Sequence, residues 1–276
     1  MNIEPLGAVG AEVAGVDVRN LSEDQFAELR AAFQQHGALF FRDQSLTPEA
    51  HIDFAERWGA ININRFFQPV PDYPQIAQVL KEPDQTINIG GGWHTDHSYD
   101  QIPAMGSILY ALDIPASGGD TMFAGMGAAY DALSDTFKEL LAPLRAVHSS
   151  RHVFGADSPH KKAMGERLGN AELATQDAVH PVVIGHPDSG RPLLYVNPGF
   201  TRRIAGMTEP ESQALLQFLY KHAMQDEFHT RFRWQKDSLA MWDNRATWHY
   251  ALNDYQGQRR HLHRITIQGE PLQAAR

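Results

Sequence analysis

Apolar residues spaced three or four positions apart predict the first helix of the chain. Phe26, Leu29 and Phe33 recur at this spacing, so one face of the helix would be apolar. Ser22 precedes the run and Gln25 follows it by three positions, which is the capping-box pattern of a helix N-terminus. The apolar run 38–41 that follows predicts a short buried strand.

Three further helices are predicted by their start signals or their composition. Thr47 followed by Pro48 marks the start of one that contains residues 51–58. Residues 128–144 are interpreted as a single helix, and Thr208 with Glu211 caps another with an apolar face further along the chain.

Between the helices lie short strand-like runs bounded by turn residues. Residues 186–192, "HPDSGRP", separate two apolar runs and predict a hairpin turn. Many short strands with helices around them indicate a mainly β fold, a β-sandwich or barrel with peripheral helices. Without a repeat or a linker-like stretch, residues 1–276 are predicted to form one domain. The strand-like runs are 104–112, 118–125, 180–197, 238–244, 247–252 and 261–269.

Composition narrows the chemistry that the chain can perform. Lys and Arg number 24 against 33 Asp and Glu, a net charge of −9, which argues against nucleic acid or an anionic membrane surface as the partner. No apolar run is long enough for a membrane span, and no signal peptide precedes the first helix, so we expect a cytoplasmic protein. The chain has no cysteine but 14 histidines, so a protein-held metal would require imidazole and carboxylate ligands.

The stretch "GGGWHTDHSYD", residues 90–100, offers such ligands. In an extended strand, residues two apart share a face, so His94 and Asp96 would point the same way. A His-x-Asp pair can supply two ligands of the 2-His-1-carboxylate triad of non-haem iron enzymes. By itself the pair is a weak signal, and a polar surface turn is the alternative.

The segment "MWDNRATWHYALNDYQGQRRHLHRITIQG" strengthens the first interpretation. His249 lies in an aromatic run, and Arg260 and Arg264 would share one face of a later strand. Arginine binds carboxylates through two parallel hydrogen bonds and keeps its charge. Two arginines beside a candidate metal ligand suggest two bound anions, although a solvated basic strand remains the alternative.

Several motifs in the same order resemble the taurine dioxygenase/TfdA family of Fe(II)- and 2-oxoglutarate-dependent dioxygenases. They run through nearly the whole chain: "GAEVAGVDV", "HGALFFRDQSLTPE", "WHTDHSY", "GGDTMFA", "AAYDALS", "YVNPGFTRRI" and "WDNRATWHYALNDY" with "RRHLHR". The resemblance implies a double-stranded β-helix, the cupin-like jelly roll. It also implies hydroxylation coupled to the oxidative decarboxylation of 2-oxoglutarate to succinate and CO2, with O2 as oxidant.

The resemblance also implies roles for individual residues. His94, Asp96 and His249 would bind iron. Thr121 and Arg260 would bind the distal carboxylate of 2-oxoglutarate, and Arg264 would bind the anionic group of the substrate. Phe154 and Phe200 would line the substrate pocket, with ordinary core packing as the alternative.

The chain departs from the taurine pattern around the substrate. Gly90 stands where the family has a substrate-binding asparagine, Asn64 where it has a histidine, and Phe67 where it has a tyrosine. His97 replaces a small apolar residue after the aspartate ligand, and is expected to line the substrate entrance or to pair with an acid such as Asp100. We therefore expect a small anionic organic substrate other than taurine: a sulfonate, a sulfate ester, an aryloxyalkanoate or another carboxylate.

Two other functions are compatible with a metal triad. One is a non-catalytic jelly-roll protein that binds metal and a small acid, and the other is a zinc hydrolase. Thr121 and Arg260 argue against both, because neither function requires a clamp for a dicarboxylate. From the resemblance we also expect a homodimer or homotetramer.

Overall fold

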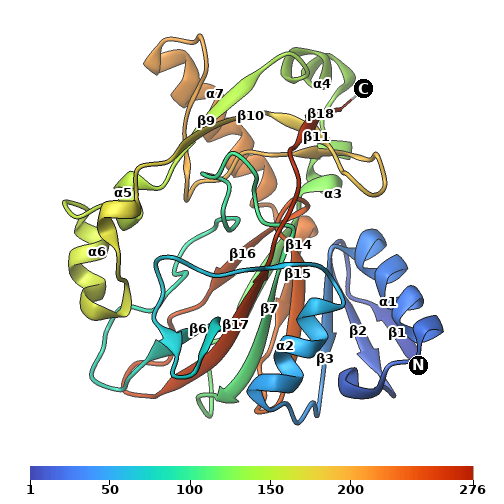
Figure 1. The fold of residues 1–276 in the computed structure, drawn as a ribbon. Coiled ribbons are helices and arrows are strands. Elements are labelled where there is room, and N and C mark those ends of the chain that lie inside the picture. The colour runs from blue at the N-terminus through green and yellow to red at the C-terminus, as the bar shows by residue number, and fades with distance from the viewer. Residues whose placement is uncertain (276) are drawn as a thin grey trace.

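The computed structural model describes residues 1–275, and its main feature is a large mixed sheet that faces a small one (Figure 1). The small sheet consists of β14 (His229–Phe232), β8 (Thr121–Gly125) and β16 (Thr247–Ala251). In spatial order the large sheet contains β1 (Asn2–Pro5), β2 (Ala11–Ala14), β3 (Ala38–Phe41), β15 (Leu239–Asp243), β7 (Gly106–Asp113), β17 (Arg260–Ile267), β6 (Tyr73–Lys81) and β5 (Pro69–Val70), with β4 (Ile61–Asn62) paired to β17.

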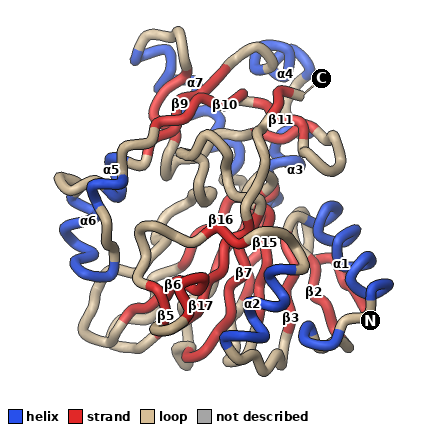
Figure 2. The backbone as a smooth tube through the Cα atoms, in the orientation of Figure 1, coloured by secondary structure: helices blue, strands red, loops and turns tan. Residues whose placement is uncertain are grey.

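Two further three-stranded sheets and seven α-helices, counted within residues 1–275, surround the two facing sheets and lie mostly outside them (Figure 2). One small sheet contains β10 (Asp177–Pro181), β9 (Arg145–Ser149) and β13 (Thr201–Ile204), and the other β12 (Pro192–Leu194), β11 (Val183–Gly185) and β18 (Gln273–Ala274). The α-helices are α1 (Glu23–His36), α2 (Pro48–Glu56), α3 (Met126–Asp131), α4 (Asp135–Leu141), α5 (Arg151–Phe154), α6 (Pro159–Met164) and α7 (Glu209–Ala223). The 3-10 helices are η1 (Val18–Asn20), η2 (Gly165–Arg167), η3 (Ala171–Leu173) and η4 (Asp226–Phe228).

Strand alternation divides the core into layers. On β3, Leu39 and Phe41 pack against α1 and α2, whereas Phe40 faces the small sheet. The ring of Phe40 lies 5.2 Å from that of Phe123 on β8 and 4.4 Å from that of Phe232 on β14, measured between centroids. A separate hydrophobic core therefore lies between the two facing sheets, as the predicted jelly roll requires. The predicted mainly β fold with peripheral helices is confirmed.

The local signals located most elements correctly. Ser22 and Gln25 form the predicted capping box of α1, and residues 186–191 connect β11 to β12 as an antiparallel hairpin. The single helix predicted over residues 128–144 is wrong. Two helices lie there, because the Ser134 hydroxyl accepts a hydrogen bond from the Phe137 amide and caps a new helix, α4.

No helix within residues 1–275 combines the length and the apolar composition needed to cross a membrane.

A buried histidine makes the packing of α2 on the large sheet sensitive to pH. His51 is 1% exposed, and neither of its ring nitrogens has a hydrogen-bond partner among the described residues. Burial, with a smaller contribution from nearby His263, lowers the pKa of His51 from 6.5 to about 3. The folded protein therefore keeps His51 neutral at pH values where the unfolded chain is protonated.

We expect the His51 contribution to lower stability as the pH drops below 6.5, by up to about 1.4 kcal/mol per pH unit, and to level off near pH 3. A His51→Leu variant should lose less stability between pH 7.5 and pH 5 than the wild type. Urea unfolding at the two pH values measures this difference, and equal losses in the two proteins would contradict the assignment.

Candidate active site

A cluster of metal-ligating side chains lies between the two facing sheets. His94, Asp96 and His249 each offer one ligand atom, and these atoms all lie within 4.8 Å of one another. The Nε2 atom of His94 is 3.7 Å from Asp96 Oδ1, and the Nε2 atom of His249 is 3.8 Å from Asp96 Oδ2. The structure thus brings together the three residues predicted to bind iron.

The backbone around His94 is not the regular strand that the His-x-Asp spacing predicted. His94 forms an isolated bridge with His249 on β16, with backbone hydrogen bonds of 3.1 Å and 2.8 Å in the two directions. A turn follows at once, and His97 has a φ of 59°. His94 and Asp96 therefore converge because the chain turns after a short pairing, not because of strand alternation.

Both histidines are in the state that metal coordination requires. The Nδ1 atom of His94 lies 2.7 Å from the carbonyl oxygen of Gly92, so this nitrogen carries the proton and Nε2 keeps its lone pair. Burial lowers the pKa of His94 and lowers that of His249 further. Both imidazoles are therefore neutral at neutral pH, and Nε2 of His94 is free to bind a metal.

The carboxylate of Asp96 is ionised although it is buried. Burial alone would raise its pKa, but Arg264 and the histidines around it hold the pKa well below its usual range. Nη1 of Arg264 donates to both carboxylate oxygens, at 3.1 Å and 3.3 Å. The predicted substrate-binding arginine therefore also contacts a predicted metal ligand.

Arg260 and Thr121 form a second polar group in the same space. Nη2 of Arg260 lies 3.5 Å from the Thr121 hydroxyl, which accepts a 2.9 Å hydrogen bond from Trp234 Nε1. Arg260 is 3% exposed and forms no ion pair within residues 1–275, and burial lowers its pKa to about 10. A buried cation next to a hydroxyl donor is suited to an anionic group supplied by a ligand.

One cavity of about 680 Å³ connects the metal-ligating cluster with both arginines. Its remaining lining is largely apolar and comes from both sheets and from the segment around α5. The apolar lining residues are Phe67, Val79, Ile87, Ile89, Trp93, Leu109, Val153, Phe154, Leu168, Pro198, Phe200, Trp242 and Ala251. Among the described residues that line the cavity, Asp96 is the only acid.

Five of the residues predicted to contact substrate line this cavity. The guanidinium carbon of Arg264 lies 4.4 Å from the centroid of the Phe67 ring. Phe154 and Phe200 also belong to a buried aromatic cluster, so the pocket and core interpretations both apply to them. Gly90 has a φ of 78°, and a Cβ there would lie 3.3 Å from a ring carbon of His94, so a side chain would be strained and would crowd the ligand.

Asn64 and His97 do not line the cavity. Nδ1 of His97 is 2.9 Å from Asp100 Oδ2, which is the pairing that the sequence offered as an alternative. Nε2 of His97 is 3.5 Å from Asn64 Nδ2, and Asn64 Oδ1 accepts hydrogen bonds from the Phe66 and Phe67 amides. The two side chains support the segment that carries Phe67.

The sequence did not assign two groups of residues that the structure places at the site. His152 and His160, from α5 and α6, line the cavity, and nothing in the spacing of those segments indicated it. Ser107 donates to Asp96 Oδ2 at 3.0 Å. Alternation along the predicted strand 104–112 could have indicated Ser107, because it shares a face with the cavity residue Leu109.

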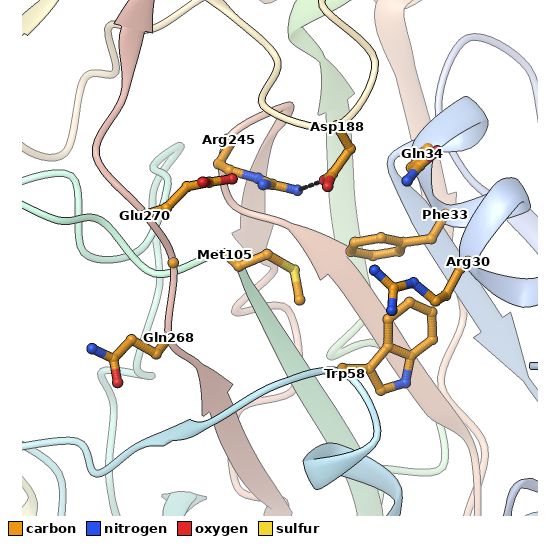
Figure 3. A pocket seen from close by; sticks show the side chains of 10 residues that line it. Arg30, Phe33, Gln34, Trp58, Met105, Asp188, Arg245, Gln268 and Glu270 are labelled. Carbon is orange, nitrogen blue, oxygen red and sulfur yellow. Dashed lines mark hydrogen bonds and ion pairs between the residues drawn. The ribbon is translucent and has the colours of Figure 1, made fainter. Parts of the chain in front are cut away.

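A smaller cavity, of about 220 Å³, has a different character (Figure 3). It lies between α1 and the residues after β17, with Phe33, Trp58 and Met105 among its walls. Arg245, on its edge, is ion-paired to Asp188 at 2.7 Å. Within the described chain no metal-ligating cluster reaches it, so the larger cavity is the candidate active site.

The residues of the large cavity fit Fe(II) and 2-oxoglutarate. Two imidazole nitrogens and a carboxylate on one side of a space form the facial donor set of non-haem iron oxygenases. The uncompensated charge of Arg260 beside Thr121 fits the distal carboxylate of 2-oxoglutarate. A jelly roll that holds both features defines the class of Fe(II)- and 2-oxoglutarate-dependent dioxygenases.

Comparison with known proteins agrees with this class. The sequence profile of the "Taurine catabolism dioxygenase TauD, TfdA family" matches residues 2–266, and the chain belongs to this family. It is therefore an enzyme that uses Fe(II), 2-oxoglutarate and O2. The alternatives of a non-catalytic acid-binding protein and a zinc hydrolase are not supported.

Individual relatives cover almost the whole chain. A sulfate ester dioxygenase dependent on alpha-ketoglutarate, from Pseudomonas putida, is 34% identical over 98% of this chain and 90% of its own. An alkylsulfatase from Acinetobacter baylyi is 33% identical over 96% of this chain and 83% of its own. The crystal structure of a taurine dioxygenase from Burkholderia xenovorans superposes with a TM-score of 0.83, at 33% identity, over 100% of this chain and 94% of its own.

Removal of one predicted ligand should abolish metal binding. We expect His249→Ala to lose both Mn(II) binding and turnover, because only His94 and Asp96 of the three clustered ligands would remain. Electron paramagnetic resonance of free Mn(II) measures the binding. His261→Ala, at a half-buried histidine outside the cavity, is the matched control, and tight Mn(II) binding by His249→Ala would refute the ligand assignment.

Proposed function

We propose that this enzyme hydroxylates a small organic anion that has one negatively charged group and an apolar body. The observation that carries the proposal is the cavity itself, where Arg264 and the metal-ligating cluster open into a largely apolar space. An apolar body gains about 25 cal/mol for each Å² of apolar surface removed from water. The substrate would be a sulfate ester, a sulfonate, an aryloxyalkanoate or a similar carboxylate.

Taurine fits this cavity poorly. A buried ammonium group is most favourable beside a carboxylate, and among the described residues that line the cavity the only acid is the metal ligand Asp96. The names of two relatives, an alkylsulfatase and a sulfate ester dioxygenase, agree with a substrate that lacks a cationic group.

Each polar residue would have a separate task. His94, Asp96 and His249 would hold Fe(II), which supplies the activation of O2 and the oxidation of the substrate C–H bond. Overall, substrate, 2-oxoglutarate and O2 become hydroxylated substrate, succinate and CO2. Thr121 and Arg260 would fix the distal carboxylate of 2-oxoglutarate by a hydrogen bond and an ion pair.

The other cavity residues would position the substrate and exclude water. Arg264 would bind the substrate anion, which sets the distance between that group and the metal-ligating cluster. Phe67, Phe154 and Phe200 would contact the substrate body and keep water out. If the hydroxylated carbon also carries a sulfate, sulfonate or aryloxy group, the product separates into a carbonyl compound and that group.

The fit to 2-oxoglutarate can be tested without knowledge of the substrate. The protein is purified anaerobically and mixed with Fe(II) and 2-oxoglutarate, and the visible charge-transfer band of the chelate is recorded. Release of succinate on admission of air is then compared across alkyl sulfates, alkyl sulfonates, aryloxyalkanoates and taurine. Stimulation by taurine above all the apolar anions would overturn the substrate assignment, and the absence of both band and succinate would overturn the function.

Substitution of the two cavity arginines should affect the KM of different ligands. Arg260→Ala is expected to raise the KM for 2-oxoglutarate by about 10-fold to 100-fold, the equivalent of a lost hydrogen bond to a charged group. Arg264→Ala is expected to raise the KM for the substrate instead, at saturating metal. Arg259→Ala, whose side chain pairs with Glu82 and Asp113 outside the cavity, is the control. Equal effects of the two cavity variants on 2-oxoglutarate would contradict this division.

Three broader expectations belong to the same proposal. The resemblance supports a homodimer or homotetramer, which light scattering measures directly. A cytoplasmic location is a further expectation, which fractionation of the producing cells measures. The family match over residues 2–266 supports one domain across residues 1–276.

A further inference from the structure

The two oxygens of the Asp96 carboxylate have different surroundings. Oδ2 accepts a hydrogen bond from the Ser107 hydroxyl at 3.0 Å and another from Arg264 Nη1 at 3.1 Å. Oδ1 has only the longer contact with Arg264, at 3.3 Å. Oδ1 is therefore the oxygen with more free acceptor capacity, and it lies 3.7 Å from the Nε2 atom of His94.

The proton of the Ser107 hydroxyl is directed toward Asp96 by a third residue. Asn244 Nδ2 donates to Ser107 Oγ at 3.3 Å, so this oxygen already accepts one bond and its own hydrogen is free for Asp96. Asn244 is itself fixed, because its backbone amide donates to the Met105 carbonyl at 2.9 Å and its carbonyl accepts from the Thr95 hydroxyl. The segment that carries Asp96 is thus tied to β7 and to the turn between β15 and β16.

Ser107 is also a fully buried polar residue in a largely apolar strand. It is 0% exposed on β7, where the next residue, Ile108, packs toward the helices and Leu109 lines the cavity. A buried hydroxyl is unfavourable unless it is hydrogen-bonded, and an apolar side chain would otherwise serve at this position. Its contacts with Asp96 and Asn244 account for a serine here.

We propose that Ser107 is a positioning residue of the metal site: together with Arg264 it fixes the Asp96 carboxylate so that Oδ1 faces the metal. The inference rests on the proposed ligand roles of His94, Asp96 and His249. Partners that orient a metal-binding carboxylate typically change metal affinity by about 10-fold to 100-fold when they are removed. Ser107 would act on the metal through Asp96, without contact to substrate or metal.

The test compares Ser107→Thr with Ser107→Val. The two new side chains have nearly the same shape, but valine has a methyl group where threonine has the hydroxyl. Mn(II) affinity is measured by electron paramagnetic resonance, and the visible spectrum of the Co(II)-loaded protein reports the ligand geometry. We expect Ser107→Val and Ser107→Ala to bind Mn(II) about 10-fold to 100-fold more weakly and to change the Co(II) spectrum. Ser107→Thr should retain most of the affinity and the wild-type spectrum.

A matched control separates this effect from the loss of any buried hydroxyl. Ser238, just before β15, is also 0% exposed and donates no hydrogen bond to Asp96, so Ser238→Ala should leave Mn(II) affinity and the Co(II) spectrum unchanged. Affinities of the valine and threonine variants within about twofold of each other, with identical spectra, would overturn the positioning role. Failure of the wild type to bind Mn(II) would instead overturn the metal site on which the inference rests.

Discussion

The burial of one carboxylate between two sheets is the constraint on which the active site depends. An isolated carboxylate is very costly in such surroundings, so Asp96 requires cations and hydrogen-bond donors around it. Arg264 comes from β17, Ser107 from β7 and His249 from β16, and Asp96 itself lies in a loop. Because these elements belong to both facing sheets, the site forms only when the jelly roll is complete. The same partners that stabilise the carboxylate also orient it.

The cavity is electropositive within a protein that has a net charge of −9. Arg260 has no acidic partner within the described chain, and Arg264 shares its guanidinium with Asp96. The buried charge of Arg260 is therefore not compensated by an acid within the described residues. In the proposed function, 2-oxoglutarate and an anionic substrate would pair with these arginines, and the apolar walls would strengthen both ion pairs by excluding water.

Local signals predicted the elements whose ends are set by neighbouring residues. The capping box at Ser22 and the hairpin at residues 186–191 are of this kind. The break between α3 and α4 was missed because Ser134 was not recognised as a cap within an otherwise helical composition. The strand expected at His94 became a bridge and a turn, because its pairing partner, His249, lies far away along the chain. The spacing of residues along one segment does not tell which distant segment will pair with it.

The sequence by itself determined the chemical groups of this protein: an N, N, O donor set without thiolates, two arginines on one strand face, and a resemblance in which several motifs keep their order. The tertiary structure decided which of these groups meet. It turned His97 away from the cavity toward Asp100, placed His152 and His160 in the wall, and brought Ser107 to the second oxygen of Asp96. The reason is physical. Ligand identity is a local property of side chains, whereas their distances depend on how two sheets pack across a shared core.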